Sequence, residues 1–65
     1  MRAKYFADTD TLLIQFSDHE IAETHDLNEN ILVETDKEGR VVCITVEHAK
    51  QRTDVNEFSY QLAST

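Results

Sequence analysis

The side chains best suited to acid–base or anion-binding chemistry follow an apolar, β-branched run in the second half of the chain. Glu47 and His48 come directly after this run, and Arg52 follows four residues later. A carboxylate and an imidazole can move protons, and a guanidinium can hold an anion. The structural interpretation, which we prefer, is that Lys50 and Arg52 pair with nearby carboxylates while His48 packs over the strands. We retain Glu47, His48 and Arg52 as ligand-site candidates, and we expect no catalytic residue.

The three histidines, His19, His25 and His48, raise the question of a metal site. Glu23 and His25 share one face of an extended chain, which suits two ligands. The chain has no HxxxH or HExxH motif and no paired cysteines, which are the usual patterns of a zinc site. We therefore expect surface histidines, no metal and no cofactor. Asp10 is expected to satisfy backbone donors in a turn, more than to form a carboxylate pair with Asp8.

Charge is distributed unevenly along the chain, whose formal net charge is −7. Between Tyr5 and Asp36 there is no Lys or Arg, whereas carboxylates are frequent. An acidic surface can simply keep a small protein soluble, or it can steer the protein towards a basic partner. Nucleic acid is not an expected partner, because binding phosphates requires clustered Lys or Arg. The partner-binding candidates of this stretch are Asp18, Glu20, Glu23 and Asp26.

The length of 65 residues allows one small domain, spanning residues 1–65. The lone Cys43 rules out a disulfide within the chain, and we expect it to fill space as a small apolar group. No apolar run approaches the roughly 18 residues of a membrane span. We therefore expect a cytoplasmic protein that does not contact a membrane.

Alternation of apolar and polar residues predicts short strands that would position these groups. The clearest signal is a hairpin of residues 31–35 and 40–47, joined by a loop in which Gly39 supplies a positive φ. Ile44 and Val46 should share one face of this hairpin with Val42, and Cys43 should lie on the other with Val41 and Leu32. The remaining expected strands are residues 3–6 and 12–16 and a short polar edge strand over 21–25.

The last third of the chain is ambiguous. Residues 47–52 favour one helical turn, and Asp54 with Glu57 fits a capping box that would begin a helix. The alternative is a strand in which Phe58, Tyr60 and Leu62 alternate with polar residues. We prefer the helix, and in both cases we expect these apolar groups to cover the sheet.

The predicted fold is therefore small α+β, an antiparallel meander of four or five strands with a short helical element covering one face. Because both hairpin faces carry apolar groups and one short helix cannot cover both, we also expect a homo-oligomer. A single thin layer rarely encloses a concave active site, so we do not expect an enzyme.

The pattern Tyr-x4-Asp-x-Leu-x-Ile-x-Phe over residues 5–16 resembles the opening of the bacterial domain of unknown function 2283 family. Ala22-Glu23-Thr24 is similar to its third strand, and residues 36–49 are similar to its closing hairpin. The resemblance covers about residues 3–52 and transfers no catalytic residue. Proteins of this family are often encoded beside small ribonuclease-like toxin candidates.

The resemblance thus implies an acidic protein-interaction module that acts as the antitoxin of a basic ribonuclease-like toxin. The alternative is a small homo-oligomeric ligand-binding or metabolic protein. In that case an intersubunit site would form around Glu47, His48 and Arg52.

Overall fold

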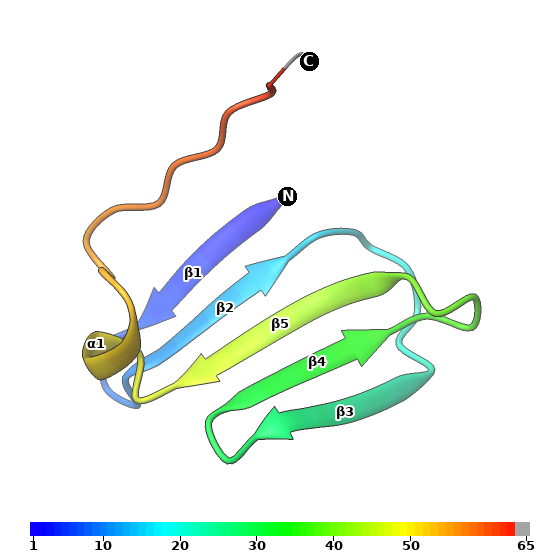
Figure 1. Cartoon of the computed structure of the whole chain (residues 1–65), viewed down its shortest axis with the longest axis horizontal. Coiled ribbons are helices and arrows are strands. Elements are labelled where there is room, and N and C mark those ends of the chain that lie inside the picture. The colour runs from blue at the N-terminus through cyan, green and yellow to red at the C-terminus, as the bar shows by residue number, and fades with distance from the viewer. Residues whose placement is uncertain (64–65) are drawn as a thin grey trace.

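The computed structural model describes residues 1–63 and consists of one antiparallel sheet with one short helix (Figure 1). The strands run in the order β1-β2-β5-β4-β3, so that β5 is central and β1 and β3 are the edges. The small α+β fold and the antiparallel sheet were predicted correctly. The elements are β1 (Arg2–Phe6), β2 (Thr11–Gln15), β3 (Glu23–Asn28), β4 (Ile31–Thr35), β5 (Val41–Glu47) and α1 (Ala49–Arg52).

The strand order differs from a simple meander at one point. β2 pairs with β5 instead of β3, so the chain crosses from the end of β2 to the far edge of the sheet (Figure 1). We call residues 16–22, which make this connection, the crossover. It rejoins the sheet where the amide of Ala22 donates to the carbonyl of Thr35, at 2.8 Å. This contact explains why β3 begins at Glu23, two residues later than the expected edge strand.

The predicted β4–β5 hairpin is present, and its loop contains Gly39 with a φ of 81°. The Asp36 carboxylate stabilises the loop by accepting the amides of Glu38 and Arg40, at 3.0 and 2.9 Å. A shift in register between Glu34 and Thr35 then marks a bulge at this end of the hairpin. The hairpin is therefore held by its own turn chemistry, as its sequence suggests.

One face of the three central strands carries mainly aliphatic side chains, and we call its aliphatic part the apolar face. Residues directly opposite each other in antiparallel strands project to the same side. Ile44 of β5 lies between Ile14 of β2 and Val33 of β4 in the sheet. The adjacent row places Val46 between Leu12 and Ile31. The six residues of the apolar face are Leu12, Ile14, Ile31, Val33, Ile44 and Val46.

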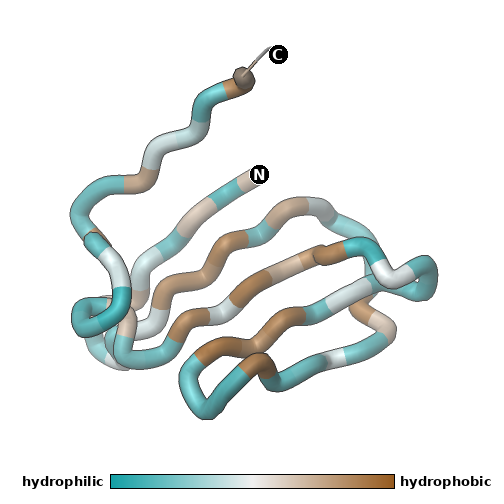
Figure 2. The backbone as a smooth tube through the Cα atoms, in the orientation of Figure 1, coloured by the Kyte–Doolittle hydropathy of each residue, from teal (hydrophilic) through white to brown (hydrophobic). Residues whose placement is uncertain are grey.

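The opposite face of the same strands is mixed. Thr45 lies between Leu13 and Leu32, and Cys43 lies between Gln15 and Glu34. Figure 2 shows the apolar segments concentrated in the central strands, whereas much of β3 is hydrophilic. Ile44 and Val46 therefore lie on one face of the sheet, and Cys43 and Leu32 lie on the other, as the alternation predicts.

The buried core is thin. Within residues 1–63, no large side chain is fully buried, and the buried apolar residues are Val42, Cys43, Val46 and Ala49. Val42 and Cys43 are neighbours and both buried, which breaks strict alternation beside the bulge. The Cys43 thiol is enclosed, as expected of a small apolar group. The rest of the apolar face is only half-buried.

The helix predicted to begin at Asp54 is absent, and so is the alternative strand. The Asp54 side chain accepts the amide of Asn56 at 3.0 Å, so it stabilises a tight turn instead of capping a helix. Residues 54–63, which we call the tail, extend past β1 (Figure 1). Phe58, Tyr60 and Leu62 are 52%, 68% and 85% exposed, so the expectation that they cover the sheet is wrong.

The short helix is present as predicted, but it packs at the end of the sheet and does not cover a face. Ala49 is completely buried there, and its amide donates to the carbonyl of Asp10 at 3.0 Å. A helix of four residues is too short to cover five strands. Among residues 1–63, no helix has the length and apolar character needed to cross a membrane.

Candidate functional site

The four predicted partner-binding residues lie along one border of the sheet, and we call them the acidic edge. Asp18 and Glu20 belong to the crossover, while Glu23 and Asp26 belong to the edge strand β3. All four are exposed, as is every residue of β3. Glu23 lies opposite Thr35 and Asp26 lies opposite Leu32, so the two project to opposite faces. The acidic edge therefore follows the rim of the sheet and does not form a patch on one face.

Few cations neutralise the acidic edge. Asp18 approaches the Arg2 guanidinium at 3.9 Å, but both side chains are largely exposed, and such pairs contribute little. Glu23 lies 3.5 Å from the imidazole of His25, which attracts it only when protonated. Within residues 1–63, Glu20 and Asp26 have no ion pair. The acidic edge consequently keeps a negative potential.

The backbone of β3 adds a second binding feature to this rim. As an edge strand, β3 leaves one row of amides and carbonyls without a neighbouring strand, and such a row can accept an added strand. The register shifts between Asp26 and Asn28, and Leu27 at that irregularity is 66% exposed. Carboxylates on the rim discourage pairing with another acidic edge, but they are compatible with a basic chain.

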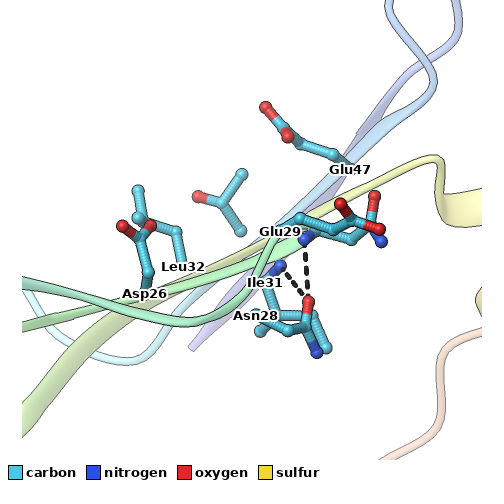
Figure 3. Close-up of a pocket in the computed structure, with 8 residues that line it drawn as sticks. Asp26, Asn28, Glu29, Ile31, Leu32 and Glu47 are labelled. Carbon is cyan, nitrogen blue, oxygen red and sulfur yellow. Dashed lines mark hydrogen bonds between the residues drawn. The ribbon is translucent and has the colours of Figure 1, made fainter.

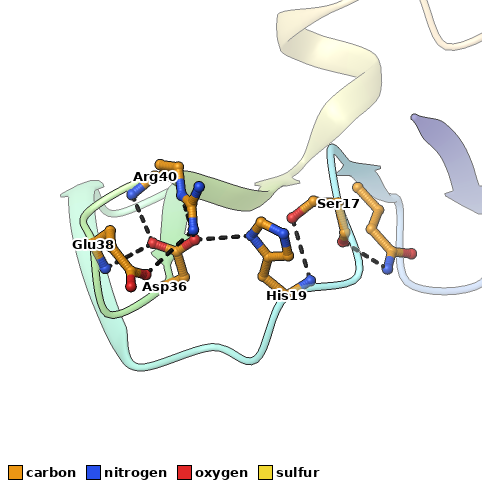
Figure 4. A network of polar contacts seen from close by, with 6 residues as sticks. Ser17, His19, Asp36, Glu38 and Arg40 are labelled. Carbon is orange, nitrogen blue, oxygen red and sulfur yellow. Dashed lines mark hydrogen bonds and ion pairs between the residues drawn. The ribbon is translucent and has the colours of Figure 1, made fainter.

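A polar network ties the crossover to the β4–β5 turn (Figure 4). The Asp36 carboxylate, which is 5% exposed, accepts hydrogen bonds from Nδ1 of His19 and Nε of Arg40, both at 3.0 Å. Burial raises the pKa of Asp36, but its hydrogen bonds with Arg40, His19 and Glu38 outweigh this effect and lower that pKa to about 2. The network fixes the crossover, and with it the position of Asp18 and Glu20.

A small hollow of about 120 Å³ opens beside the turn between β3 and β4 (Figure 3). Asp26, Glu29 and Glu47 line it, and Asn28 closes the turn by accepting the amides of Asn30 and Ile31. No group of three or more His, Cys, Asp or Glu side chains among residues 1–63 is arranged to hold a metal ion. The carboxylates that line the hollow give the rim additional acidic character.

Within residues 1–63, no hydrogen bond or ion pair joins the side chains of the ligand-site candidates Glu47, His48 and Arg52. Nδ1 of His48 lies 2.9 Å from the side-chain oxygen of Asn30, and His48 has a positive φ of 55° where the chain turns into α1. Glu47 ends β5 and Arg52 ends α1, both exposed. The geometry gives His48 a structural role at this junction.

A second junction, which sequence reasoning recognised in part, joins Asp10 to α1. The Asp10 carboxylate accepts the hydroxyl of Tyr5 at 2.6 Å and the amide of Lys50 at 3.1 Å. The hydrogen bond with Asp10, with burial and the adjacent negative charge, raises the pKa of Tyr5 to about 12. The pKa of Asp10 is lowered, chiefly by the same bond. Asp10 therefore accepts a backbone amide as predicted, but the donor belongs to α1 and not to the turn that contains Asp10.

Cys43 lies in an environment that disfavours its reactive form. Burial raises the pKa of the thiol, and the negative charge of Glu34 acts in the same direction. Because the thiolate is the nucleophile, a raised pKa reduces reactivity. The structure thus gives Cys43 no feature of a catalytic nucleophile.

Comparison with known proteins gives one match. A family profile described as "Protein of unknown function (DUF2283)" matches residues 2–50, which is most of the chain. No curated protein and no solved structure matches it significantly. The matched region includes the sheet, the crossover and the first residues of α1.

Proposed function

The chain belongs to the DUF2283 family of proteins of unknown function, and we propose that it is a small, non-enzymatic interaction module whose acidic edge binds a basic protein. The observation that carries this proposal is the position of Asp18, Glu20, Glu23 and Asp26 on an exposed sheet rim. An acidic rim accelerates encounter with a basic surface, and complementary charges then set the orientation of the two proteins.

The free edge of β3 supports the same proposal, because it offers backbone hydrogen bonds beside the charges. A partner that adds a strand there would gain hydrogen bonds from the main chain and charge pairs from its side chains. Exposed Leu27 supplies an apolar contact in the middle of this surface. The bound segment would therefore be extended and basic.

The more specific form of the proposal is an antitoxin whose partner is a basic, ribonuclease-like toxin in the cytoplasm. Its support is the family resemblance together with the chemistry of the partner. A ribonuclease must present Lys and Arg to RNA phosphates. An acidic protein that occupies those cations blocks access to RNA without needing an active site of its own.

The test is capture of a basic protein from host lysate by the immobilised full chain at low and high salt. Asp18→Asn, Glu20→Gln and Glu23→Gln together should slow association, because rim charges act mainly on encounter. High salt should have the same effect, since the Debye length is only about 8 Å at physiological ionic strength. The fold should persist, because all three residues are exposed.

The matched control neutralises three exposed carboxylates away from the acidic edge, with Asp8→Asn, Asp54→Asn and Glu57→Gln. Both variants have the same net charge, so a difference between them reports the location of the charges. Weaker capture by the edge variant alone supports the proposal. Equal capture by the wild type and the edge variant, or capture of no basic protein, would contradict it. That result would favour the alternative, a homo-oligomer with a ligand site around Glu47, His48 and Arg52.

A further inference from the structure

We infer that the apolar face is the interface of a face-to-face homodimer in which a second copy of this chain supplies the missing layer. The inference is independent of the proposed function, because it concerns the face of the sheet and not the acidic edge. Its starting point is that six adjacent aliphatic side chains on the central strands have no covering layer within residues 1–63. Five of the six are only half-buried, and Val46 alone is buried.

The exposed area of the chain is larger than a compact protein of this length requires. The accessible surface is 5211 Å². A compact chain of this size would expose about 4,200 Å², and the difference is comparable with the roughly 800 Å² that each partner contributes to a standard interface. The radius of gyration, 12.6 Å, also exceeds the value of about 11 Å for a compact chain of this length. The extended tail and the uncovered sheet both contribute to these differences.

The tail of the same chain is too narrow to be the missing layer. Neighbouring strands lie about 4.8 Å apart, so five strands form a surface about 20 Å across, whereas one extended segment covers about the width of one strand. The tail also offers only three large apolar side chains, those of Phe58, Tyr60 and Leu62, to cover the six residues of the apolar face.

A charged partner also fits the apolar face poorly, because none of its six residues carries a charge. A two-fold dimer places the same surface against itself, which suits a patch that is uniformly aliphatic. Two stacked sheets pack about 10 Å apart, with their inner side chains interdigitated. A second copy is therefore the occupant that matches both the width and the chemistry of the face.

The side chains that the two edge strands project to the apolar side favour one orientation of the dimer. Glu23 of β3 lies opposite Thr35 and therefore projects to the apolar side of the sheet. On the same side, β1 carries the uncharged residues Ala3 and Tyr5. A two-fold axis parallel to the strands and passing beside central β5 places β1 of each copy over β3 of the other. A perpendicular in-plane axis would place each β3 over its own equivalent, which puts the Glu23 carboxylates of both copies at the same edge of the dimer. In the first arrangement, Ile44 of one copy faces Ile44 of its partner.

The first test is sedimentation equilibrium of the full chain at micromolar to millimolar concentration, where we expect twice the mass of one chain. Val33→Lys puts a charge on the apolar face and should give a folded monomer. Leu32→Lys is its matched control, since Leu32 is adjacent in β4, similarly half-buried and on the opposite face near Asp26 and Glu47. This control should remain a dimer. Circular dichroism verifies that each variant is folded.

The second test does not depend on whether Val33→Lys folds. In a Cys43→Ala background, Ile44→Cys should form a disulfide between two copies under mild oxidation, and Leu32→Cys should not. A wild-type chain that stays monomeric throughout, or that associates only when a basic partner is added, would overturn the inference. Dimers that are disrupted equally by Val33→Lys and Leu32→Lys would also overturn the inference. A disulfide formed by Leu32→Cys instead of Ile44→Cys would overturn it as well. A wild-type monomer that dimerises only after Phe58→Ser and Leu62→Ser would identify the tail as the covering segment, which also overturns it.

Discussion

At the β4–β5 turn, four donors converge on the Asp36 carboxylate: the amides of Glu38 and Arg40, the Arg40 guanidinium and the His19 imidazole. The folded state lowers the pKa of Asp36 from 3.8 to about 2. A lowered pKa means that ionised Asp36 stabilises the folded state above its unfolded pKa, and that this contribution is lost as the pH falls towards the folded value.

We therefore expect the urea midpoint of the wild type to fall between pH 4 and pH 2 more steeply than that of Asp36→Asn. Asp36→Asn should also be the less stable protein at neutral pH, because it lacks the charge that these donors require. Glu38→Gln serves as a control, since Glu38 is exposed and accepts only the Arg40 guanidinium, at 3.3 Å. Identical acid profiles for the wild type and Asp36→Asn would disprove the assignment.

The Tyr5–Asp10 bond makes a separate prediction about titration. The chain has two tyrosines, so Tyr60→Phe leaves Tyr5 as the only phenol. Its ionisation, followed by ultraviolet absorbance, should have a midpoint of about 12. Asp10→Asn should move the midpoint towards the ordinary value of 10.0, because it removes both the carboxylate acceptor and its charge. A midpoint unaffected by Asp10→Asn would show that the hydrogen bond does not persist in solution.

At the scale of single residues, sequence reasoning identified the role of Asp10 but not its distant partner. Asp10 was expected to satisfy backbone donors of its turn, and instead it accepts the amide of Lys50, 40 positions away. The pairing of His19 with Asp36 was not predicted, because the residues are 17 positions apart and meet only through the path of the crossover. The one available signal was an aspartate three residues before the glycine of a hairpin loop. Exposure of the acidic edge followed directly from its composition.

Among the elements, β5 should contribute most to stability, since it lies at the centre of the sheet. Truncating a buried Ile costs about 2–5 kcal/mol, and Ile44, half-buried in one chain, should lie near the lower limit. Ile44→Ala should lower the urea midpoint more than Leu13→Ala, which affects the mixed face. If the two midpoints shift equally, the apolar face does not dominate the packing.

In contrast to β5, the tail should contribute little to the stability of the fold. Phe58 and Leu62 are exposed, so replacing both by Ser should change the free energy of unfolding by no more than about 0.5 kcal/mol. Chemical denaturation monitored by circular dichroism measures this change. Ser59→Ala, a neighbouring exposed position, provides the baseline for a neutral substitution. If the double substitution lowers the free energy of unfolding by several times this limit, the tail packs against the sheet in solution.

The elements that were predicted correctly are those specified by nearby residues. The β4–β5 hairpin has β-branched strands and a glycine at the turn, and both signals act within a few residues. The pairing of β2 with β5 could not be predicted in the same way, because it depends on which distant strand completes the sheet. The helix expected from Asp54 failed for a related reason: a capping pattern begins a helix only when an apolar stripe has a surface to pack on.

For the whole molecule, the inferred dimer would use two different surfaces for two purposes. The apolar face would be buried against its equivalent, while the acidic edge would remain on the rim and free to meet a basic partner. The net charge of −7 opposes association, but the carboxylates of the acidic edge lie outside the aliphatic rows of the face. The two proposals are therefore compatible, and each can fail without the other.

If folding and dimerisation are coupled through the apolar face, the thermal midpoint should depend on protein concentration. Two chains unfold from one dimer, so a tenfold increase in concentration stabilises the folded dimer by about 1.4 kcal/mol. For about 130 residues unfolding together, this corresponds to a rise in Tm of about 5 °C. Val33→Lys, as a folded monomer, should unfold at a temperature that does not depend on concentration, whereas Leu32→Lys should follow the wild type. Calorimetry over a hundredfold concentration range measures the slope, and a flat wild-type response would mean that one sheet is stable with its apolar face exposed to water.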